Sequence, residues 1–310
     1  MDRIKSLVVR NLLKEYRKNS NFLSTEKLKF VGETVVGKDV YNVSKEFVYN
    51  GKTYIFGRVE ARNSELSLTV LFEKKDGVYY ETETKFSMLQ DPCVAKINGD
   101  IVLNGTEVYA NEEGQIYAWR TVFFNDVFNK PNKFLQAPLK MKDARVYQYS
   151  GGYVAFSRPQ GEKGGRGKIG YITAKTLEEI TEQAIDDAPL INGMFDDESW
   201  GGVNDAVELE NGNIGVIGHI ASMEEGDIRH YYGMTFVLNP TTGEFSDLKI
   251  VCERKDFEAG EYKRPDLIDV VFMGGMNFND DGTATLFTGL SDAEAHKGVI
   301  KSPFSVGCKK

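Results

Sequence analysis

The sequence predicts an all-β protein, a five-bladed β-propeller with four-stranded antiparallel blades around a central channel. Three observations predict this fold. One short pattern occurs five times in the 310 residues, and its copies are spaced at about the length of a propeller blade. Long amphipathic helices are nearly absent, and only residues 175–185 have the pattern of a short helix.

Each copy of the pattern is a tight turn followed by a short strand. The copies are NGKTYIFGRVE from Asn50, NGDIVLNGTEV from Asn98, GGYVAFSRPQ from Gly151, NGNIGVIGHIA from Asn211 and DGTATLFTGLS from Asp281. Six residues after each turn glycine stands a small residue: Gly57, Gly105, Ser157, Gly218 or Thr288. The turns suit antiparallel hairpins, and the small residues suit strands that pack closely against a neighbouring backbone.

A second strand-like run precedes each turn and opens with Asp or Asn. These five openers are Asn42, Asp91, Asp143, Asp205 and Asp269, at intervals of 49, 52, 62 and 64 residues. The intervals match a four-stranded blade with its loops. We therefore expect one domain over residues 1–310, with an N-terminal extension (1–26) and blades at about 27–85, 86–138, 139–198, 199–262 and 263–310. Residues 27–36 are expected to add the strand that closes the last blade.

Composition limits the classes of partner and the compartment. The net charge of −8 disfavours nucleic acid and anionic membranes as partners. The N-terminal segment is too charged for a signal peptide or a membrane span. Three widely spaced cysteines are most simply reduced thiols in a cytoplasmic protein. Residues 161–168 (GEKGGRGK) fail the spacing of a phosphate loop and predict a flexible hairpin loop, lying over the channel mouth.

The openers also predict a functional site. In a propeller the innermost strands surround the axis, so their first residues converge at one mouth of the channel. Carboxylates so close require a proton on one of them, a cation such as Ca²⁺, or basic neighbours. A protonatable acid among fixed charges is what glycoside cleavage requires. The alternative for each opener is structural, because Asp at a strand start often caps a turn.

Individual residues differ in what they favour. Asp91 precedes Pro92 and is the candidate general acid. Trp200 could offer its flat face to a sugar ring, and Asp292 could bind a sugar hydroxyl. His219 suits either a ligand contact or a satisfied interior position. No dedicated cation loop is present, so the sequence predicts no metal site, although Ca²⁺ or phosphate at the channel mouth is compatible with it.

These residues carry a resemblance to the five-bladed propellers of the arabinanase, invertase and mannoside-phosphorylase superfamily. The chain resembles glycoside hydrolase family 130 in its motifs, and domain-of-unknown-function family 1861 overall, from about residue 28 to 304. Gln90-Asp91-Pro92 is similar to a Glu-Asp-Pro motif whose Asp donates the proton, with Gln in place of Glu. Lys142-Asp143, Arg158 and His219 resemble further motifs, although Ile220 replaces a Gly.

The resemblance implies a carbohydrate-active enzyme at the channel mouth, an inverting glycosidase or a glycoside phosphorylase with a β-mannoside-like substrate, acting on a small oligosaccharide or glycoside without a cofactor. It implies that Lys142, Arg158 and His219 hold phosphate. Hydrolysis would instead need a base, for which Glu60, Glu65 and Asp205 are candidates. The remaining expected substrate contacts are Asn42, Arg58, Asp143, Trp200, Asp269 and Asp292.

Two other functions remain open from the sequence. A non-catalytic glycan-binding propeller is favoured by Gln90 in place of Glu. A protein-interaction scaffold is a weaker alternative, because the repeats lack a Trp-Asp signature and the polar residues gather at the starts of inner strands. Fold alone does not choose among these functions.

Overall fold

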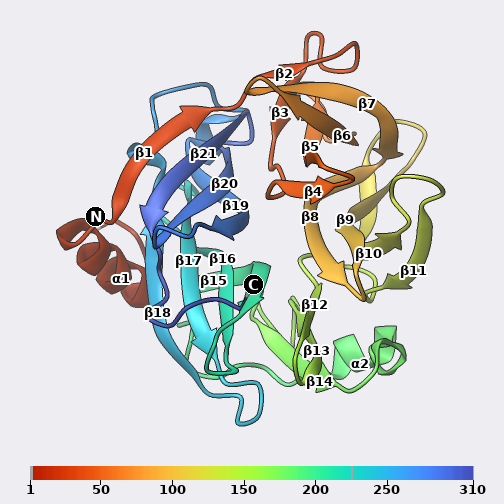
Figure 1. Ribbon diagram of the computed structural model, residues 1–310. Coiled ribbons are helices and arrows are strands. Elements are labelled where there is room, and N and C mark those ends of the chain that lie inside the picture. Colours follow the sequence, from red (N-terminus) through yellow and green to blue (C-terminus); the bar gives the residue numbers. More distant parts are fainter. Residues whose placement is uncertain (1–2, 225, 310) are drawn as a thin grey trace.

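The structure is a computed structural model that describes residues 3–224 and 226–309. Its strands fall into five successive antiparallel groups among these residues, which we call blades I to V, and Figure 1 shows them placed around a common centre. The all-β propeller that the repeats predict is therefore confirmed. Two short pairings are parallel: residues 30–31 with 79–80 inside blade I, and residues 230–231 with 269–270, which link blades IV and V.

The blades use nearly all strands in chain order. Blade I contains β2 (Phe30–Val31), β3 (Asp39–Tyr41), β4 (Phe47–Tyr49), β5 (Lys52–Glu60), β6 (Leu68–Lys75) and β7 (Val78–Ser87). Blade II contains β8 (Leu89–Ile97), β9 (Asp100–Ala110), β10 (Ile116–Asn125) and β11 (Asn132–Gln136). Blade III contains β12 (Arg145–Tyr149), β13 (Gly152–Ser157) and β14 (Gly170–Ala174). Blade IV contains β15 (Ser199–Glu208), β16 (Ile214–Met223), β17 (Arg229–Leu238) and β18 (Phe245–Cys252). Blade V contains β19 (Asp269–Phe278), β20 (Thr283–Leu290), β21 (Glu294–Lys301) and β1 (Phe22–Lys27).

The repeated glycines have the two roles that their pattern predicts. At Asn50-Gly51 both residues have positive φ, 48° and 74°, as a tight type I′ hairpin turn requires. In the third copy the positive φ falls on Gly152 (126°) instead of Gly151. On β16, a Cβ added to Gly218 would lie 2.2 Å from the carbonyl oxygen of Gly202, so the neighbouring strand packs against a bare backbone there.

The ring closes with a different segment from the one expected. The strand β1 pairs antiparallel with β21, from Phe22 opposite Ile300 to Lys27 opposite His296, and Figure 1 shows these two strands side by side. Residues 27–36 contribute only Lys27 to this strand, and Phe30–Val31 pair with β7 of blade I. The expectation was wrong because the closing strand lies in the segment 1–26 that was expected to be an extension.

The N-terminal segment also contains a helix that the repeat analysis did not predict. Helix α1 (Leu7–Lys18) begins at Ser6, whose hydroxyl accepts a hydrogen bond from the amide of Val9. Its buried residues Val9, Leu13 and Tyr16 recur at helical spacing and face the molecule, while charged residues cover the outer side. The expected helix near 175–185 is present as α2 (Glu182–Asp187), preceded by the 3₁₀ turn η1 (Leu177–Glu179). Two further 3₁₀ turns are η2 (Arg254–Asp256) and η3 (Pro265–Leu267).

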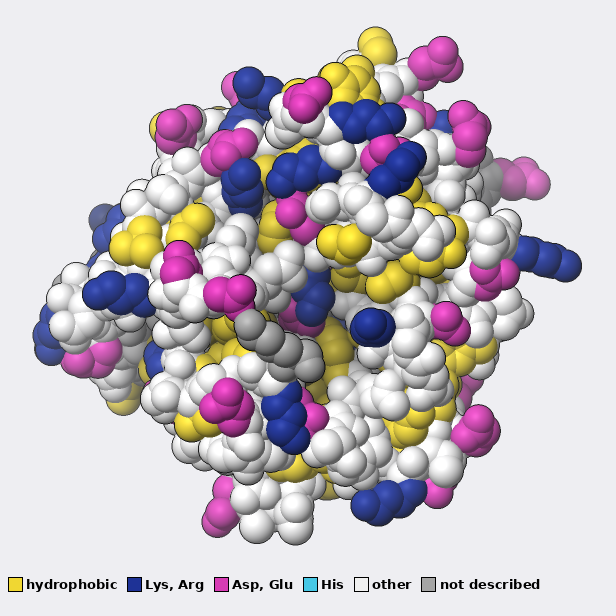
Figure 2. All heavy atoms as spheres, in the orientation of Figure 1, with side chains coloured by type: hydrophobic (Ala, Val, Ile, Leu, Met, Phe, Trp, Pro, Cys, Tyr) yellow, Lys and Arg dark blue, Asp and Glu magenta, His cyan; other side chains and the backbone are white. Residues whose placement is uncertain are grey.

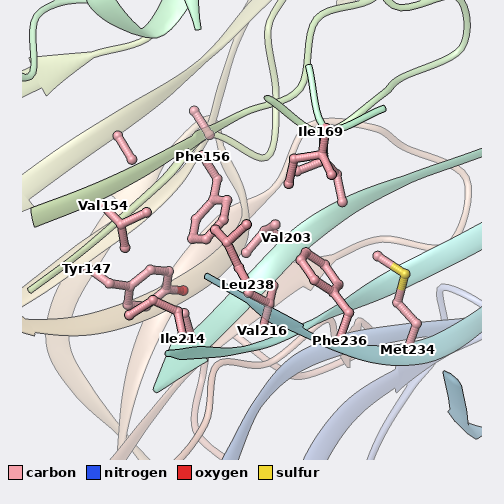
Figure 3. Packing of buried hydrophobic residues seen from close by; sticks show 14 of the residues in the cluster. Tyr147, Val154, Phe156, Ile169, Val203, Ile214, Val216, Met234, Phe236 and Leu238 are labelled. Carbon is pink, nitrogen blue, oxygen red and sulfur yellow. The ribbon is translucent and has the colours of Figure 1, made fainter. Parts of the chain in front are cut away.

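The largest apolar cluster joins blades III and IV. Figure 3 shows Tyr147 and Phe156 of blade III packed near Val216 and Phe236 of blade IV. Burying such side chains stabilises the contact by about 25 cal/mol for each Å² of apolar surface removed from water. Two residues of the site described below depend on this core: Arg158 directly follows β13, and His219 lies within β16.

Two further features of the described chain bear on the expectations. No helix in residues 3–224 and 226–309 is long and apolar enough to cross a membrane. The three cysteines are unpaired, with Cys93 and Cys252 buried and Cys308 partly exposed.

Candidate active site

A cavity of about 350 Å³ lies where the five blades meet. Figure 2 shows a face whose middle is hollowed, with acidic and basic side chains around the hollow. Five lysine and arginine side chains line the cavity against four carboxyl groups, although the chain as a whole is acidic. The lining residues are Asn42, Arg58, Glu65, Gln90, Asp91, Lys142, Asp143, Arg158, His219, Arg229, Tyr231, Arg264, Leu267, Val270, Phe272 and Asp292.

The second strand of a blade supplies three of the polar residues from one repeated position. Arg58, Arg158 and His219 each directly follow the small residue of the sequence pattern, in blades I, III and IV. The small residue lets the strand approach its neighbour, and the next residue then points to the centre. This position is a signal in the sequence that the analysis of the openers did not use.

Three of the five openers line the cavity. Asn42, Asp91 and Asp143 have positive φ values of 44°, 52° and 60°, a backbone conformation that Asn and Asp tolerate better than other non-glycine residues. The chain bends there and aims the side chain at the axis. At these three positions the backbone conformation that suits Asn or Asp also brings the side chain to the cavity.

The other two openers do not line the cavity. Asp205 is buried, and its carboxylate accepts hydrogen bonds from Lys45 Nζ at 2.8 Å and from the amides of Ala206 and Met276. Asp269 lies against His230 and Tyr232 on the outer side of β19. Asp205 lies inside β15 and is not among the residues with positive φ, so the chain does not turn its side chain to the cavity as it does at the other three openers.

The acidic side of the cavity is organised around Asp91. Its Oδ1 accepts hydrogen bonds from Asn42 Nδ2 at 2.8 Å and from Arg58 Nη1 at 3.1 Å. Asp292 lines the same space and, among the described residues, makes neither a hydrogen bond nor an ion pair. Burial raises the pKa of Asp292, Arg58 partly opposes this, and the charge of Asp91 adds to it. The two carboxyl groups therefore sit in different environments within one cavity.

The residues proposed as bases are tied to cations. Glu60 is buried and away from the cavity, where Arg58 at 2.6 Å, Lys263 and the hydroxyl of Tyr41 at 2.7 Å surround its carboxylate. Glu65 lines the cavity but pairs with Lys263 at 3.0 Å and Arg264 at 2.7 Å. Burial would raise the pKa of Glu65, but these cations lower it on balance. Both carboxylates are poor bases in this arrangement.

The basic side of the cavity is built on Asp143 and Arg158. Asp143 is buried between Arg145 Nη2 at 3.2 Å and Arg158 Nη1 at 3.5 Å. Burial would raise the pKa of Asp143, but the charges of Arg158 and Arg145 lower it to about 2. Arg158 Nη1 has no hydrogen-bond partner among the described residues. No carboxylate of the described chain pairs with the ammonium of Lys142, which lines the cavity beside it.

His219 completes this side as a neutral group. Burial, opposed in part by Asp143 and assisted by Arg158, lowers the pKa of His219 to about 3. Its Nδ1 lies 2.8 Å from the carbonyl oxygen Oδ1 of Asn204, which can only accept, so Nδ1 carries the proton and Nε2 is an acceptor. The ring stacks on Tyr231 with centroids 5.6 Å apart.

The aromatic wall comes from residues that the sequence analysis missed. Trp200 does not line the cavity: it is 4% exposed and donates a hydrogen bond from Nε1 to the hydroxyl of Tyr231 at 3.0 Å. Tyr231 and Phe272 line the cavity instead. The other lining residues not predicted are Arg229, Leu267 and Val270. Trp200 was predicted to contact the sugar because the chain has only two tryptophans, whereas Tyr231 is one of 15 tyrosines and its sequence neighbours give no signal.

No metal centre is found in the part of the chain that the structure describes. Among residues 3–224 and 226–309, no three His, Cys, Asp or Glu side chains are grouped so that they could hold an ion. The carboxylates at the cavity are balanced instead by Arg58, Arg158 and their neighbours.

Comparison with known proteins defines the group to which the chain belongs. It is similar to MPT-4, a mannose phosphorylase from Leishmania mexicana in complex with phosphate ion, at 32% identity over 96% of this chain and 93% of that one, with a TM-score of 0.88. It is similar to MPT-1, a GDP-Man-dependent mannosyltransferase from Leishmania mexicana, at 29% identity over 96% of both chains and a TM-score of 0.86. A β-1,2-mannobiose phosphorylase from Listeria innocua shares the fold, at 16% identity over 87% of this chain and 92% of that one, with a TM-score of 0.61.

The fold and the polar cavity at its centre define a β-propeller of the glycoside hydrolase-like superfamily. Residues 14–306 match the family described as "Protein of unknown function (DUF1861)", and the chain belongs to this family. No curated protein matches the sequence.

Proposed function

We propose that the protein is a carbohydrate-active enzyme, a glycoside phosphorylase whose reaction takes place in the central cavity. One observation carries the proposal: Lys142 pairs with no carboxylate of the described chain, and Arg158 Nη1, 3.5 Å from Asp143, makes no hydrogen bond among the described residues, in the same space as Asp91. Guanidinium and ammonium groups bind phosphate by charge-assisted hydrogen bonds. The similarity to a mannose phosphorylase with bound phosphate supports this assignment.

The positions and ion pairs of the three candidate bases favour phosphate over water as the nucleophile. Inverting hydrolysis needs a carboxylate that takes a proton from water. Glu60 and Asp205 do not line the cavity, and Glu65 is paired with two cations. Phosphate needs no such base because it is already an anion.

The reaction we propose forms one bond and breaks one bond. A phosphate oxygen attacks the anomeric carbon, the bond from that carbon to the glycosidic oxygen breaks, and the Asp91 carboxyl group gives its proton to the leaving oxygen. The products are a sugar 1-phosphate of inverted configuration and a shortened acceptor. Asn42 and Arg58 hold Asp91 in place, and Asp292 binds a sugar hydroxyl near it.

The phosphate site consists of Lys142, Arg158 and His219. Arg158 and Lys142 donate to phosphate oxygens. The neutral His219 accepts the hydrogen bond of the phosphate O–H through Nε2, which a protonated histidine could not do. The sugar we propose is mannose in a β-linkage, on the similarity to a mannose phosphorylase, and its ring packs against Tyr231 and Phe272.

A turnover assay with and without phosphate tests the proposal. Purified protein is incubated with a panel of β-mannosides and other glycosides, and sugar 1-phosphate and free sugar are measured separately. We expect sugar 1-phosphate from a β-mannoside only when phosphate is present, and a loss of about 100-fold or more in kcat for Asp91→Asn. Asp247→Asn changes an exposed aspartate with a similar positive φ and should leave turnover unchanged.

The other outcomes separate the competing functions. Free sugar without phosphate would make the protein a hydrolase. Sugar binding without turnover under either condition would make it a glycan-binding propeller, the function that Gln90 favours. In the structure the Gln90 side chain donates to the carbonyl oxygen of Glu65 at 2.8 Å and thereby holds the neighbouring loop.

A further inference from the structure

The side chain of Arg158 lies between two glycines from different blades. A Cβ added to Gly167 would lie 2.6 Å from Cζ and 2.7 Å from Nε of Arg158. A Cβ added to Gly202 on β15 would lie 2.8 Å from Cδ of Arg158. Distances under 3.0 Å are essentially never observed for a real Cβ, so each position accepts Arg158 in this place only because it is glycine.

Backbone carbonyls beside these glycines fix the direction of the guanidinium group. Arg158 Nε donates to the carbonyl oxygen of Gly201 at 2.7 Å, and Nη2 donates to that of Arg166 at 3.3 Å. A guanidinium group is planar and presents its donors in a rigid fork. With Nε and Nη2 engaged, the direction of Nη1 is set: it lies 3.5 Å from Asp143 Oδ2 and has no hydrogen-bond partner in the described chain.

The segment that contains Gly167 is itself held in place. Gly161 and Gly165 exchange backbone hydrogen bonds of 2.8 and 2.7 Å, and the amide of Gly201 donates to the carbonyl of Gly167 at 3.1 Å. The guanidinium of Arg166 lies 5.1 Å from the ring centroid of Trp200. The glycine-rich segment predicted as a flexible loop is therefore fastened to blade IV by its backbone and by Trp200.

We propose that this glycine-rich segment, residues 159–168, is a positioning device that works with Gly202 to aim Nη1 of Arg158 at the phosphate. Gly167 provides room for the guanidinium plane, Arg166 provides the carbonyl that orients it, and Trp200 anchors Arg166. The segment fails the spacing of a phosphate loop and acts on phosphate through one arginine. This inference rests on the proposed role of Arg158 as a phosphate ligand.

The test compares two glycine-to-alanine substitutions in the same segment. Gly167→Ala places a methyl group against the guanidinium, whereas Gly165 also has positive φ (60°) but its Cβ would meet nothing within 4 Å. We expect Gly167→Ala to raise the KM for phosphate by about tenfold or more, with the KM for the sugar substrate changed less than about twofold. Gly165→Ala should keep both KM values.

Binding of inorganic phosphate to the full chain, measured by titration calorimetry, gives a readout independent of turnover. We expect weaker binding for Gly167→Ala and also for Gly202→Ala, which has ordinary φ and serves if Gly167→Ala does not fold. Because a Cβ at Gly202 would also lie 2.9 Å from Cε1 of His219, Gly202→Ala is compared in the Arg158→Lys background as well. A double-mutant cycle with Arg158→Lys separates positioning from general damage. Lysine has no guanidinium plane, so Gly167→Ala should have little further effect in the Arg158→Lys background.

The outcomes distinguish this inference from the proposed function. If the unmodified protein binds phosphate and Gly167→Ala and Gly202→Ala bind it equally well, or if the losses from Gly167→Ala and Arg158→Lys simply add, the positioning role is overturned and the phosphate site stands. If the unmodified protein shows neither phosphate binding nor phosphate-dependent turnover, the proposed function fails, and this inference fails with it.

Discussion

At the scale of single residues, the site uses carboxyl groups whose surroundings differ. Asp143 is buried between two arginines that lower its pKa to about 2, after burial alone would raise it. Asp292 has no such partner in the described chain, and burial together with Asp91 raises its pKa against the pull of Arg58. Asp292 also has a positive φ of 50°, a strained conformation of the kind found at functional sites.

The raised pKa of Asp292 has a consequence for stability. Its charged form is less favourable in the folded than in the unfolded chain, so stability is lost as the pH rises from the ordinary aspartate pKa through the raised value. Asp292→Asn should therefore raise the Tm at pH 7.5, and the gain should shrink as the pH falls toward about 4. Calorimetric unfolding at both pH values measures this.

The control for that measurement is Asp247→Asn. Asp247 has a φ of 56°, close to that of Asp292, but it is 43% exposed and pairs with Lys249 at the surface. The Asp247→Asn variant measures how much Asn stabilises a backbone position of positive φ, and it should change the Tm little. An Asp292→Asn variant no more stable than this control at pH 7.5 would contradict the account of Asp292.

The sequence predicted the position of a residue correctly where its own backbone conformation decides whether it lines the cavity. Asn42, Asp91 and Asp143 are at the cavity because a positive φ both selects Asn or Asp and turns the side chain inward. Asp205 shares their sequence pattern, but it lies inside β15 without a positive φ, and its side chain binds Lys45 instead. Contacts between blades, such as Arg58 with Asp91, are not encoded in any local pattern.

At the scale of elements, the strands were predictable and helix α1 was missed. The strands follow from turns and spacing within about ten residues of sequence. Helix α1 has its buried residues at Val9, Leu13 and Tyr16, a helical pattern, but no repeat draws attention to it. Arg17 near its end pairs with the buried Glu253, so the helix is fixed to blade IV by charge as well as by packing.

We expect the packing of α1 to contribute substantially to stability. Leu13 is fully buried, so Leu13→Ala should lower the free energy of unfolding by about 2–5 kcal/mol. Leu7 lies on the same helix and is 58% exposed, so Leu7→Ala should change it by less than about 0.5 kcal/mol. Urea unfolding of both variants gives the comparison. Equally small changes in the free energy of unfolding for both variants would show that the packing of α1 contributes little to stability.

At the scale of the whole molecule, five blades share one cavity, and no blade contains the site alone. Arg58 comes from blade I, Asp91 from blade II, Arg158 from the end of blade III, and His219 from blade IV. A change that opens the ring of blades therefore disrupts the site as well as the fold. The closing contact between β1 and β21 is the link that joins the two ends of the chain.

Two N-terminal deletions test this link. Removing residues 1–20 deletes α1 and keeps β1, whereas removing residues 1–28 deletes both and leaves blade V with an open edge at β21. We expect the shorter deletion to retain cooperative thermal unfolding at a lower Tm. We expect the longer deletion to lose cooperative unfolding and to aggregate, because the exposed edge can pair with other chains. Cooperative unfolding of the longer deletion would show that the ring does not need β1.

The closing strand also sets the order of events during synthesis on the ribosome. Its residues, Phe22–Lys27, are translated before the strands of all five blades that follow, and their partners in β21, Glu294–Lys301, come after those strands. At translation rates of about 5–20 residues per second, β1 waits roughly 15–50 s for the strand that completes its pairing. During that interval the growing chain carries β1 without its partner strand. The pairing of β1 with β21 therefore forms only after the strands of all five blades have been synthesised.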